Sequence, residues 1–393
     1  MTSERKRRLT VKKEDLTLIY NDFGDLKLSA LGMGCMRLPL KDKKIDVDQV
    51  RQMVKYAFDN GVNYFDTAWG YHDGESEKVM GEVLADYPRD SFYLASKFPG
   101  YDVSNIGKQE EIFATQLKKC RVDHFDFYLI HNVCETNIEG YLDEGYGVVE
   151  YFVEQKKLGK IKHLGCSVHA QIGPMKRFFE KWGKYMEFCQ IQLNYVDYDF
   201  QDAKLKLDLL KQYGIPVWVM EPLRGGKLAD LPAPLADKVD AIRDDENRIG
   251  MAFRYLQSFP QVKVVLSGMS SLEQIKQNIA TFSTFKPATP QENQILYETA
   301  KALTGKNTLP CTGCAYCTSY CPQKLNIPEL VKYYNDYLVT DGGFLAPMAI
   351  GAMPDDKKPS ACVACRSCEA VCPQRIKISE AFADFSEKLG LKK

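Results

Sequence analysis

Short apolar runs alternate with longer amphipathic stretches along the first 285 residues of the chain. Short runs rich in β-branched and aromatic residues are typical of strands that are buried on both faces, and apolar residues at a spacing of three to four indicate helices. This pattern predicts strands at residues 31–36, 62–66, 92–97, 125–131, 162–167, 187–192, 216–221 and 262–267. It predicts helices between them at residues 47–60, 76–87, 106–119, 144–158, 175–182, 201–213, 247–258 and 271–282.

Eight alternations of strand and helix predict an α/β fold, a parallel (β/α)8 TIM barrel, which typically takes about 250 residues. A doubly wound sheet is the alternative, but no G-x-G-x-x-G motif follows an early strand, and the sequence has no G-x-x-x-x-G-K-[ST] phosphate loop. Residues 18–29, with Asn21, Asp22 and Gly24 at the turn, predict a hairpin that precedes the barrel and closes its lower end.

At 393 residues the chain exceeds the usual size of one core, so we expect two domains. We place the barrel at residues 15–285, a connector with one helix (291–303) at 286–309, and a smaller domain at 310–393. Helices expected after Asn326 and Ile378 make that smaller domain mainly helical. Residues 344–353 are apolar but too short to span a bilayer, and they contain Pro347 and Gly351, so we expect a buried loop or a docking surface.

Two nearly identical cysteine motifs dominate the smaller domain. Each reads C-x2-C-x2-C-x3-C-P, the spacing of bacterial ferredoxins in which the fourth cysteine of one run ligates the cluster built by the other. We therefore expect a ferredoxin-like domain with two [4Fe-4S] clusters, whose loading is coupled to folding. The predicted ligand sets are Cys311, Cys314, Cys317 and Cys372 for one cluster, and Cys362, Cys365, Cys368 and Cys321 for the other.

Zinc and disulfides are the alternatives for these cysteines. Paired C-x2-C units bind zinc, but a third cysteine two residues on and a fourth before proline fit a zinc site poorly. Disulfides require an oxidising compartment, whereas residues 1–15 are charged and lack the apolar core of a secretion signal, so we expect a cytoplasmic protein. Five further cysteines lack ligand spacing and are expected to be buried thiols: Cys35, Cys120, Cys134, Cys166 and Cys189.

The charge balance gives no reason to expect a nucleic acid or membrane partner. The 52 lysine and arginine residues equal the 52 aspartate and glutamate residues, so no bulk electrostatic attraction to polyanions exists. Basic clusters at residues 5–8 and 12–13 are local, and we expect a solvated terminus there.

Polar residues end three consecutive predicted strands. In a (β/α)8 barrel the carboxyl ends of the strands converge on one face, where active sites are found. The second, third and fourth strands bring Asp66, Lys97 and His131 to that face, and Tyr71 follows on the adjoining loop. Each residue alone has a structural explanation, as an ion pair or a core histidine, but together they indicate one site.

These residues stand in motifs that resemble those of the aldo-keto reductase superfamily. FDTAWGY at residues 65–71, followed by Glu75-Ser76-Glu77 and Gly81, resembles that family's DTAxxYG...SE...G stretch. Ser96-Lys97 and the D-F-Y-L-I-H segment at 126–131 are similar to its lysine and histidine motifs. The strand ends at 165–167, 190–192, 221–223 and 268–278 follow in the family's order. More narrowly, the chain resembles the subgroup with a C-terminal double [4Fe-4S] ferredoxin-type domain.

The resemblance implies that a nicotinamide hydride is exchanged with a small-molecule carbonyl or alcohol. It makes Tyr71 the general acid or base, and Lys97 the cation that favours the ionised phenol. Asp66 would keep Lys97 charged, and His131 would direct the carbonyl oxygen toward Tyr71.

The resemblance also implies a nucleotide site that uses NADP or NAD. It assigns six positions to that site: Ser167, Gln190, Gly268, Ser270, Gln274 and Asn278. Ser167 and Gln190 would hold the carboxamide of the nicotinamide. The other four lie near a predicted helix start, where the backbone favours phosphate. Gln274 stands where an arginine usually meets the 2′-phosphate, a loss for which Arg224 or Lys227 would compensate. Met220 replaces a stacking aromatic and Val168 an amide, so a flavin is a further option.

Three functions are compatible with these features. The favoured one is an iron-sulfur oxidoreductase whose clusters relay electrons between an external carrier, such as a redox protein, and chemistry at the barrel mouth. The second is an NAD(P)H-dependent carbonyl reductase whose clusters are structural or regulatory. The third is a non-enzymatic electron-transfer or regulatory subunit. Two loop histidines, His72 and His169, are additional candidates to line the site.

Overall fold

The structure, a computed structural model, describes residues 18–135, 137–305, 308–311, 313, 315, 317–372 and 374–391. The first three residues of the predicted barrel domain (15–17), the basic N-terminal clusters and Cys314 therefore lie outside the described residues. No helix in these described ranges is long and apolar enough to cross a membrane.

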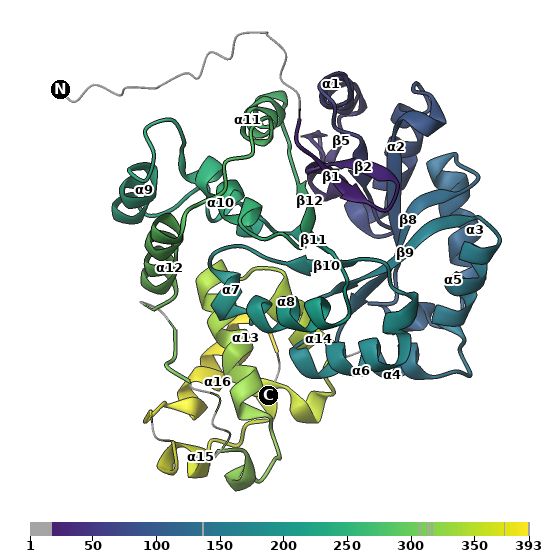
Figure 1. Cartoon of the computed structure of the whole chain (residues 1–393). Helices are drawn as coiled ribbons and strands as arrows, with labels where there is room; N and C mark the ends of the chain where they lie inside the picture. Colours follow the sequence, from purple (N-terminus) through teal and green to yellow (C-terminus); the bar gives the residue numbers. More distant parts are fainter. Residues whose placement is uncertain are drawn as a thin grey trace.

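Eight parallel strands close into a barrel in the order β10-β11-β12-β3-β6-β7-β8-β9 (Figure 1). All eight strands lie where the apolar runs predicted them, which confirms the barrel over the doubly wound sheet. Their bounds are β3 Leu31–Gly34, β6 Tyr64–Asp66, β7 Tyr93–Phe98, β8 Phe125–Val133, β9 Ile161–Val168, β10 Cys189–Gln192, β11 Val217–Met220 and β12 Val262–Ser267.

Eight helices at the predicted places cover the barrel. They are α1 Val47–Asp59, α2 Ser76–Leu84, α3 Gln109–Cys120, α5 Val148–Lys157, α6 Ile172–Trp182, α8 Ala203–Gln212, α10 Arg248–Gln257 and α11 Leu272–Phe282. The amphipathic pattern is explained by a large core between strands and helices, with a second cluster of buried side chains inside the barrel. Among the α-helices and strands of the described barrel, five short ones in the loops have no counterpart in the prediction: α4 Ile138–Leu142, α7 Asp197–Phe200, α9 Ala233–Asp240, β4 Leu40–Lys41 and β5 Lys44–Ile45.

The predicted N-terminal hairpin consists of β1 (Tyr20–Phe23) and β2 (Leu26–Ser29), paired antiparallel. Its turn lies at Gly24 and the following residue, and Gly24 has a positive φ of 57°. The turn was expected to include Asn21 and Asp22, but both lie in β1. Asn21 instead donates a hydrogen bond to the Lys263 carbonyl at 2.7 Å, which ties the hairpin to β12.

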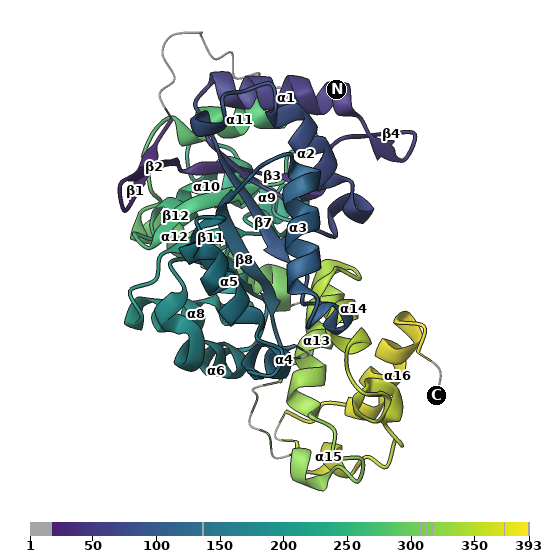
Figure 2. The same cartoon turned by 90° about the vertical axis from the view of Figure 1, so that its right-hand side faces the viewer.

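The ring of Phe23 extends from the hairpin into the interior of the barrel. Its centroid lies 5.7 Å from that of Phe127, 5.1 Å from His163 and 5.1 Å from Trp218. The hairpin lies on the side of the barrel away from the second domain (Figures 1 and 2). It therefore closes the end of the barrel opposite the active-site face, as the sequence predicted.

The C-terminal region is helical and has a core of its own. Its helices are α13 Ile327–Thr340, α14 Leu345–Gly351, α15 Ser367–Ala370 and α16 Ile378–Lys388. The preceding helix, α12 (Pro290–Gly305), packs on the barrel, because Leu296 and Ala300 belong to the barrel core. Figure 2 shows α13 and α14 between the barrel and the rest of the second domain.

Residues 345–351 form helix α14 rather than a loop, although Ala346, Ala349 and Ile350 are buried as expected. Pro347 stands in the first turn of α14, where backbone N–H groups have no partner within the helix in any case, and a proline costs little there. Met348 of α14 contacts Asn132 of the barrel, so this helix packs on the barrel, and a docking surface for a partner stays a prediction.

Candidate functional site

A cleft of about 420 Å³ opens at the carboxyl ends of the barrel strands. Tyr71 and His131 line this cleft, and their rings meet edge to face with centroids 6.3 Å apart. Asp66 and Lys97 are buried beside Tyr71, with exposed fractions of 2 % and 0 %. The structure therefore brings the four residues of the strand-end argument together.

Lys97 is the centre of this group. Its Nζ donates hydrogen bonds to Asp66 Oδ1 at 2.5 Å and to the Thr67 carbonyl at 2.7 Å. It also lies 3.3 Å from the hydroxyl oxygen of Tyr71. Because all three contacts converge on one ammonium, its position relative to the phenol is fixed by the ends of β6 and β7.

Burial and charge act in opposite directions on these groups. Burial raises the pKa of Tyr71, and the charge of Lys97 opposes that rise. Burial acts to lower the pKa of Lys97, but attraction to Asp66 prevails and raises it, so the ammonium stays charged. Burial, and then the charge of Lys97, lowers the pKa of His131 well below its usual value, so this imidazole is neutral.

Ser167 and Gln190, the predicted carboxamide ligands, also line the cleft. Asn132, directly after the strand-end histidine, lies beside them and was not predicted. Its backbone N–H donates to Ser167 Oγ at 2.7 Å, and its φ of 53° turns the chain at this point. Asn132 Oδ1 and Gln190 Oε1 are buried without a hydrogen-bond partner among the described residues, as is His131 Nδ1. The three residues line the cleft, and unsatisfied buried polar atoms beside a cleft call for an explanation such as a bound ligand.

The other four predicted nucleotide residues lie in the loop before α11 and in the first two turns of that helix, and none of them lines the cleft. Gln274 Oε1 accepts a hydrogen bond from the Ser270 N–H at 2.7 Å, so this side chain closes the loop on itself. Asn278 is buried and donates to Ser267 Oγ at 3.0 Å. Gly268 is exposed, and a side chain there would meet Arg37, which lines the cleft and had not been predicted.

Of the two cations expected to compensate at the nucleotide site, one is already paired. Arg224 is buried and binds Asp197 through Nε and Asp336 of α13 through Nη2, both at 2.9 Å. Lys227 is exposed and lines the cleft. His169 lines it too, whereas His72 Nε2 accepts a hydrogen bond from the Leu38 N–H at 3.0 Å.

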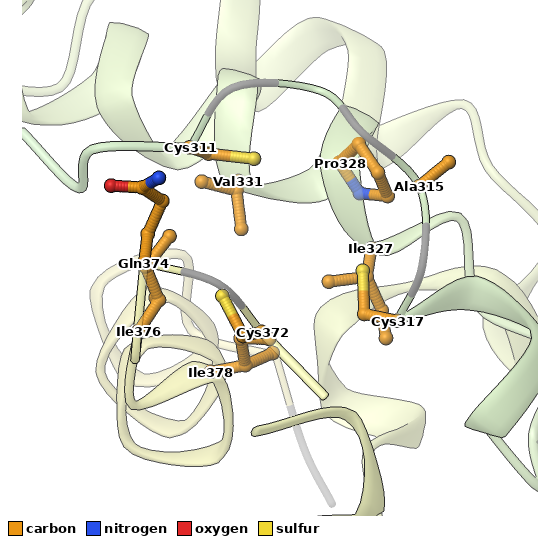
Figure 3. Close-up of a pocket in the computed structure, with 10 residues that line it drawn as sticks. All are labelled: Cys311, Ala315, Cys317, Ile327, Pro328, Val331, Cys372, Gln374, Ile376 and Ile378. Carbon is orange, nitrogen blue, oxygen red and sulfur yellow. The ribbon is translucent and has the colours of Figure 1, made fainter. Parts of the chain in front are cut away.

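The motif cysteines surround two cavities in the second domain. Cys311, Cys317 and Cys372 line the first, together with Ile327 and Val331 of α13 and other apolar side chains, as Figure 3 shows. The structure thus brings the last cysteine of the second motif to the first motif. Cys314, the fourth member of this predicted set, lies outside the described residues.

The second cavity is lined by Cys321, Cys362, Cys365 and Cys368, the whole of the other predicted set. Among the residues that the structure describes, no three metal-binding side chains converge on a single point. Thiols spread around a cavity suit a cluster of several iron atoms better than one zinc ion. The five other cysteines are all buried, as expected.

The model of the aldo/keto reductase family matches residues 30–300, more than half of the chain. This chain belongs to the aldo/keto reductase family, a family of oxidoreductases. A model of the 4Fe-4S dicluster domain matches residues 310–377, so the aldo/keto reductase barrel is followed by a domain of that type.

Individual relatives resemble the barrel part of this aldo/keto reductase. The uncharacterized oxidoreductase YqkF of Bacillus subtilis is 24% identical over 284 residues, which cover 65% of this chain and 87% of that protein. Among solved structures, the holo form of aldo-keto reductase AKR11C1 from Bacillus halodurans has a TM-score of 0.59 and 24% identity, covering 72% of this chain and 97% of that one. An aldo-keto reductase from Klebsiella pneumoniae, in complex with NADPH, has a TM-score of 0.57 and 20% identity, covering 69% and 91%.

Several residues of the aldo/keto reductase motif have structural contacts in this chain. Ser76 Oγ lies 2.9 Å from Thr67 Oγ1, and Glu77 Oε1 accepts a hydrogen bond from Ser96 at 2.6 Å. These contacts tie α2 to the ends of β6 and β7. A side chain at Gly81 would lie 2.5 Å from the Lys119 carbonyl, so glycine allows α2 to pack closely on α3. The motif therefore supports the strand ends that carry Asp66 and Lys97.

Proposed function

We propose that this chain is an iron-sulfur oxidoreductase of the aldo/keto reductase type. It reduces the carbonyl group of a small molecule, or oxidises the corresponding alcohol, at the barrel mouth. It exchanges electrons with an external carrier, such as a redox protein, through two [4Fe-4S] clusters. The observation that carries the chemistry is the 3.3 Å contact between the Lys97 ammonium and the Tyr71 hydroxyl, beside His131 in the cleft.

The unpartnered atoms of the cleft suit the primary carboxamide that a nicotinamide carries. That group has two N–H donors and one carbonyl acceptor. Asn132 Oδ1 and Gln190 Oε1 are two buried acceptors, and the Ser167 hydroxyl, which already accepts from the Asn132 N–H, has its own proton to donate. A flavin presents one N–H between two carbonyls, which matches these groups less well. The donor and acceptor pattern therefore supports NADP or NAD as the cofactor of the cleft.

The four side chains divide the proton chemistry among them. When bound, a nicotinamide would supply or take a hydride, which carries two electrons, and each iron-sulfur cluster would supply or take one electron, so two single-electron transfers balance one hydride. In reduction Tyr71 donates its hydroxyl proton to the carbonyl oxygen, and in oxidation the phenolate takes the proton from the alcohol. Lys97 stabilises the phenolate, and Asp66 holds the ammonium in place. Neutral His131 donates a hydrogen bond that orients the reacting oxygen.

The two cysteine cavities support binding of two clusters, and the first cavity lies on the same helix as the barrel mouth. Cys311, Cys317, Cys372 and Cys314 would hold one cluster, and Cys321, Cys362, Cys365 and Cys368 the other. Helix α13 lines the first cavity with Val331 and the cleft with Thr340. Nine residues of α-helix span about 14 Å, so one rigid element reaches from the first cavity to the cleft.

An NAD(P)H-dependent carbonyl reductase with structural or regulatory clusters is the second candidate. The observation that favours it is that, within the described ranges, no residue lines both a cysteine cavity and the cleft. Clusters held there would stabilise the second domain without touching the substrate. A non-enzymatic subunit has less support, because the four side chains of the site are assembled in full.

The replacement Tyr71→Phe tests the proposed chemistry. We expect carbonyl reduction by the anaerobically reconstituted protein to fall by roughly 10²-fold or more, because general acid catalysis contributes about 10²–10⁴-fold. The iron content and nucleotide affinity of Tyr71→Phe should not change. The matched control is Tyr101→Phe, which removes a neighbouring hydroxyl in the cleft. Turnover by Tyr71→Phe equal to that of the unaltered protein would exclude Tyr71 as the general acid.

Stopped-flow absorbance distinguishes the two candidate functions. If electrons pass through the clusters, their visible absorbance should bleach and recover within each turnover, at a rate no slower than product formation. Turnover with NAD(P)H while the absorbance stays constant would favour the second candidate.

A further inference from the structure

The second domain forms one wall of the substrate cleft. Beyond the barrel residues, the lining includes five side chains or backbone positions from the end of α13 and the start of α14. They are Asp336, Thr340, Gly343, Phe344 and Leu345. The two helices are joined by a turn in which Gly342 has a φ of 91°. This turn and the helix ends beside it form a corner at the barrel mouth.

Polar contacts, one buried and one partly buried, fix α13 to the barrel. Asp336, which is 2 % exposed, accepts hydrogen bonds at Oδ1 from Arg224 Nη2 and Gln201 Nε2, each at 2.9 Å. One helical turn earlier, Lys332 Nζ contacts Gln171 Oε1 at 2.6 Å and Asp202 Oδ2 at 2.8 Å. Since charge-assisted contacts of this kind are short and directional, the helix has one position on the barrel.

The start of α14 is held next to the catalytic group. The side-chain amide of Asn132 donates to Met348 Sδ at 3.2 Å, and Asn132 directly follows His131. The corner between the two anchors is therefore a fixed wall of the cleft rather than a hinged lid.

The wall is apolar and uncharged at residues 343–345, whereas the carboxylate of Asp336 is paired with Arg224. Phe344 is 61 % exposed, a high value for a large aromatic, and its ring lies 6.5 Å from that of His169 at an interplanar angle of 68°. Burial, followed by the charge of Lys206, lowers the pKa of His169 to about 3, so this imidazole is neutral. Tyr101, which also lines the cleft, meets the His131 ring edge to face at 5.2 Å. Aromatic walls favour apolar and ring-shaped ligands.

From this arrangement we infer that the dicluster-type domain is part of the substrate site, and that Phe344 contacts the substrate. The wall selects carbonyl compounds, or the corresponding alcohols, that carry an aromatic or extended apolar group, over short polar ones. This inference rests on the proposed function for the reacting carbonyl, but the contact itself concerns binding alone.

The variant Phe344→Ala tests the inference by kinetics. With 4-nitrobenzaldehyde as the aromatic probe, we expect KM to rise roughly tenfold while kcat stays within about twofold, because the lost contact is remote from the reacting atoms. With propanal, KM should stay unchanged. Phe285→Ala removes an equally exposed aromatic outside the cleft, with 65 % exposure, and is the matched control. An equal effect on both aldehydes, or the same effect from Phe285→Ala, would overturn the inference.

A binding measurement separates this inference from the proposed function. Saturation-transfer NMR on the reconstituted Tyr71→Phe protein reports contact of 4-nitrobenzaldehyde without turnover. We expect a signal that weakens at least threefold when Phe344→Ala is added, with unchanged iron content. If the native sequence turns over no aldehyde but this difference in signal persists, the proposed reaction is refuted and the contact of Phe344 with the ligand is supported. If the signal is the same in both proteins, the wall is refuted even when turnover occurs.

Discussion

Burial and the ammonium of Lys97 act in opposite directions on the pKa of the Tyr71 phenol, and burial prevails. Burial raises the pKa of Tyr71 above its ordinary value near 10, and the Lys97 charge limits that rise. In the proposed reaction, carbonyl reduction needs the protonated phenol, which the raised pKa preserves throughout the neutral range. Alcohol oxidation needs the phenolate, so its rate should increase as the pH rises toward the pKa of Tyr71.

Replacing Lys97 with methionine should move this rise to higher pH. Without the cation, burial and the Asp66 charge both raise the pKa of Tyr71, so oxidation at pH 9 should fall by roughly 10²-fold, whereas reduction should fall less. The pH profile of kcat/KM for the free enzyme measures the shift. The double variant Asp66→Asn/Lys97→Met removes both charges and controls for the buried unpaired carboxylate. An unchanged profile in both variants would contradict the assignment.

The residue at position 274 should decide the preference between NADP and NAD. Gln274 is exposed and uncharged, and its amide oxygen is used by the Ser270 N–H. A charge-assisted hydrogen bond contributes about 1.5–3 kcal/mol, so Gln274→Arg should improve NADPH binding relative to NADH by about tenfold or more. Isothermal titration with both nucleotides measures the ratio. Gln277→Arg, on the same helix, is the control, and an equal change there would point to nonspecific attraction.

At the scale of elements, the hairpin of β1 and β2 stabilises the barrel by filling its lower end. Phe23 packs in a cluster with Phe127 and Trp218, and it is partly buried. Fully buried Phe→Ala changes cost about 3–5 kcal/mol, so Phe23→Ala should cost about 2–3 kcal/mol. Denaturant unfolding monitored by far-ultraviolet circular dichroism measures this loss. Tyr20→Ala, on the same strand but exposed, should cost clearly less, and an equal loss would argue against the packing role.

The helices and strands that could be predicted from the sequence were those long enough to show a repeat of apolar positions. The eight strands and eight covering helices of the barrel all lie where apolar repeats indicated. Short loop helices such as α7, with four residues, are too brief to show a 3.6-residue repeat. Helix α14 was misjudged because proline usually ends a helix, whereas at the start of one it is tolerated.

At the scale of the whole molecule, a buried ion pair joins the two domains. Arg224 and Asp336 are 4 % and 2 % exposed, and Asp197 binds the same guanidinium from the barrel side. Removing one partner of a buried pair typically costs about 3–5 kcal/mol, because the other charge stays buried without compensation.

The variant Asp336→Ala should therefore loosen the second domain from the barrel. We expect a loss of about 3 kcal/mol or more, seen as a separate earlier transition in calorimetry and as faster proteolysis in the segment 308–326. The double variant Arg224→Met/Asp336→Leu, which replaces the pair with apolar groups, should recover much of the loss. A single unchanged transition in Asp336→Ala would show that the pair does not hold the domains together.

The sequence by itself determined the parts of this protein that depend on local spacing. Alternating apolar repeats specify the barrel, because each strand and helix must bury one face. The positions of Asp66, Lys97 and His131 at strand ends follow from that topology, and the spacing of the cysteines indicates iron-sulfur chemistry. Tertiary structure alone decided that Arg37, Asn132 and Phe344 belong to the cleft. Met348 and Asn132 are 216 residues apart, and contact between them depends on how two separately packed cores fit together, which no local period records.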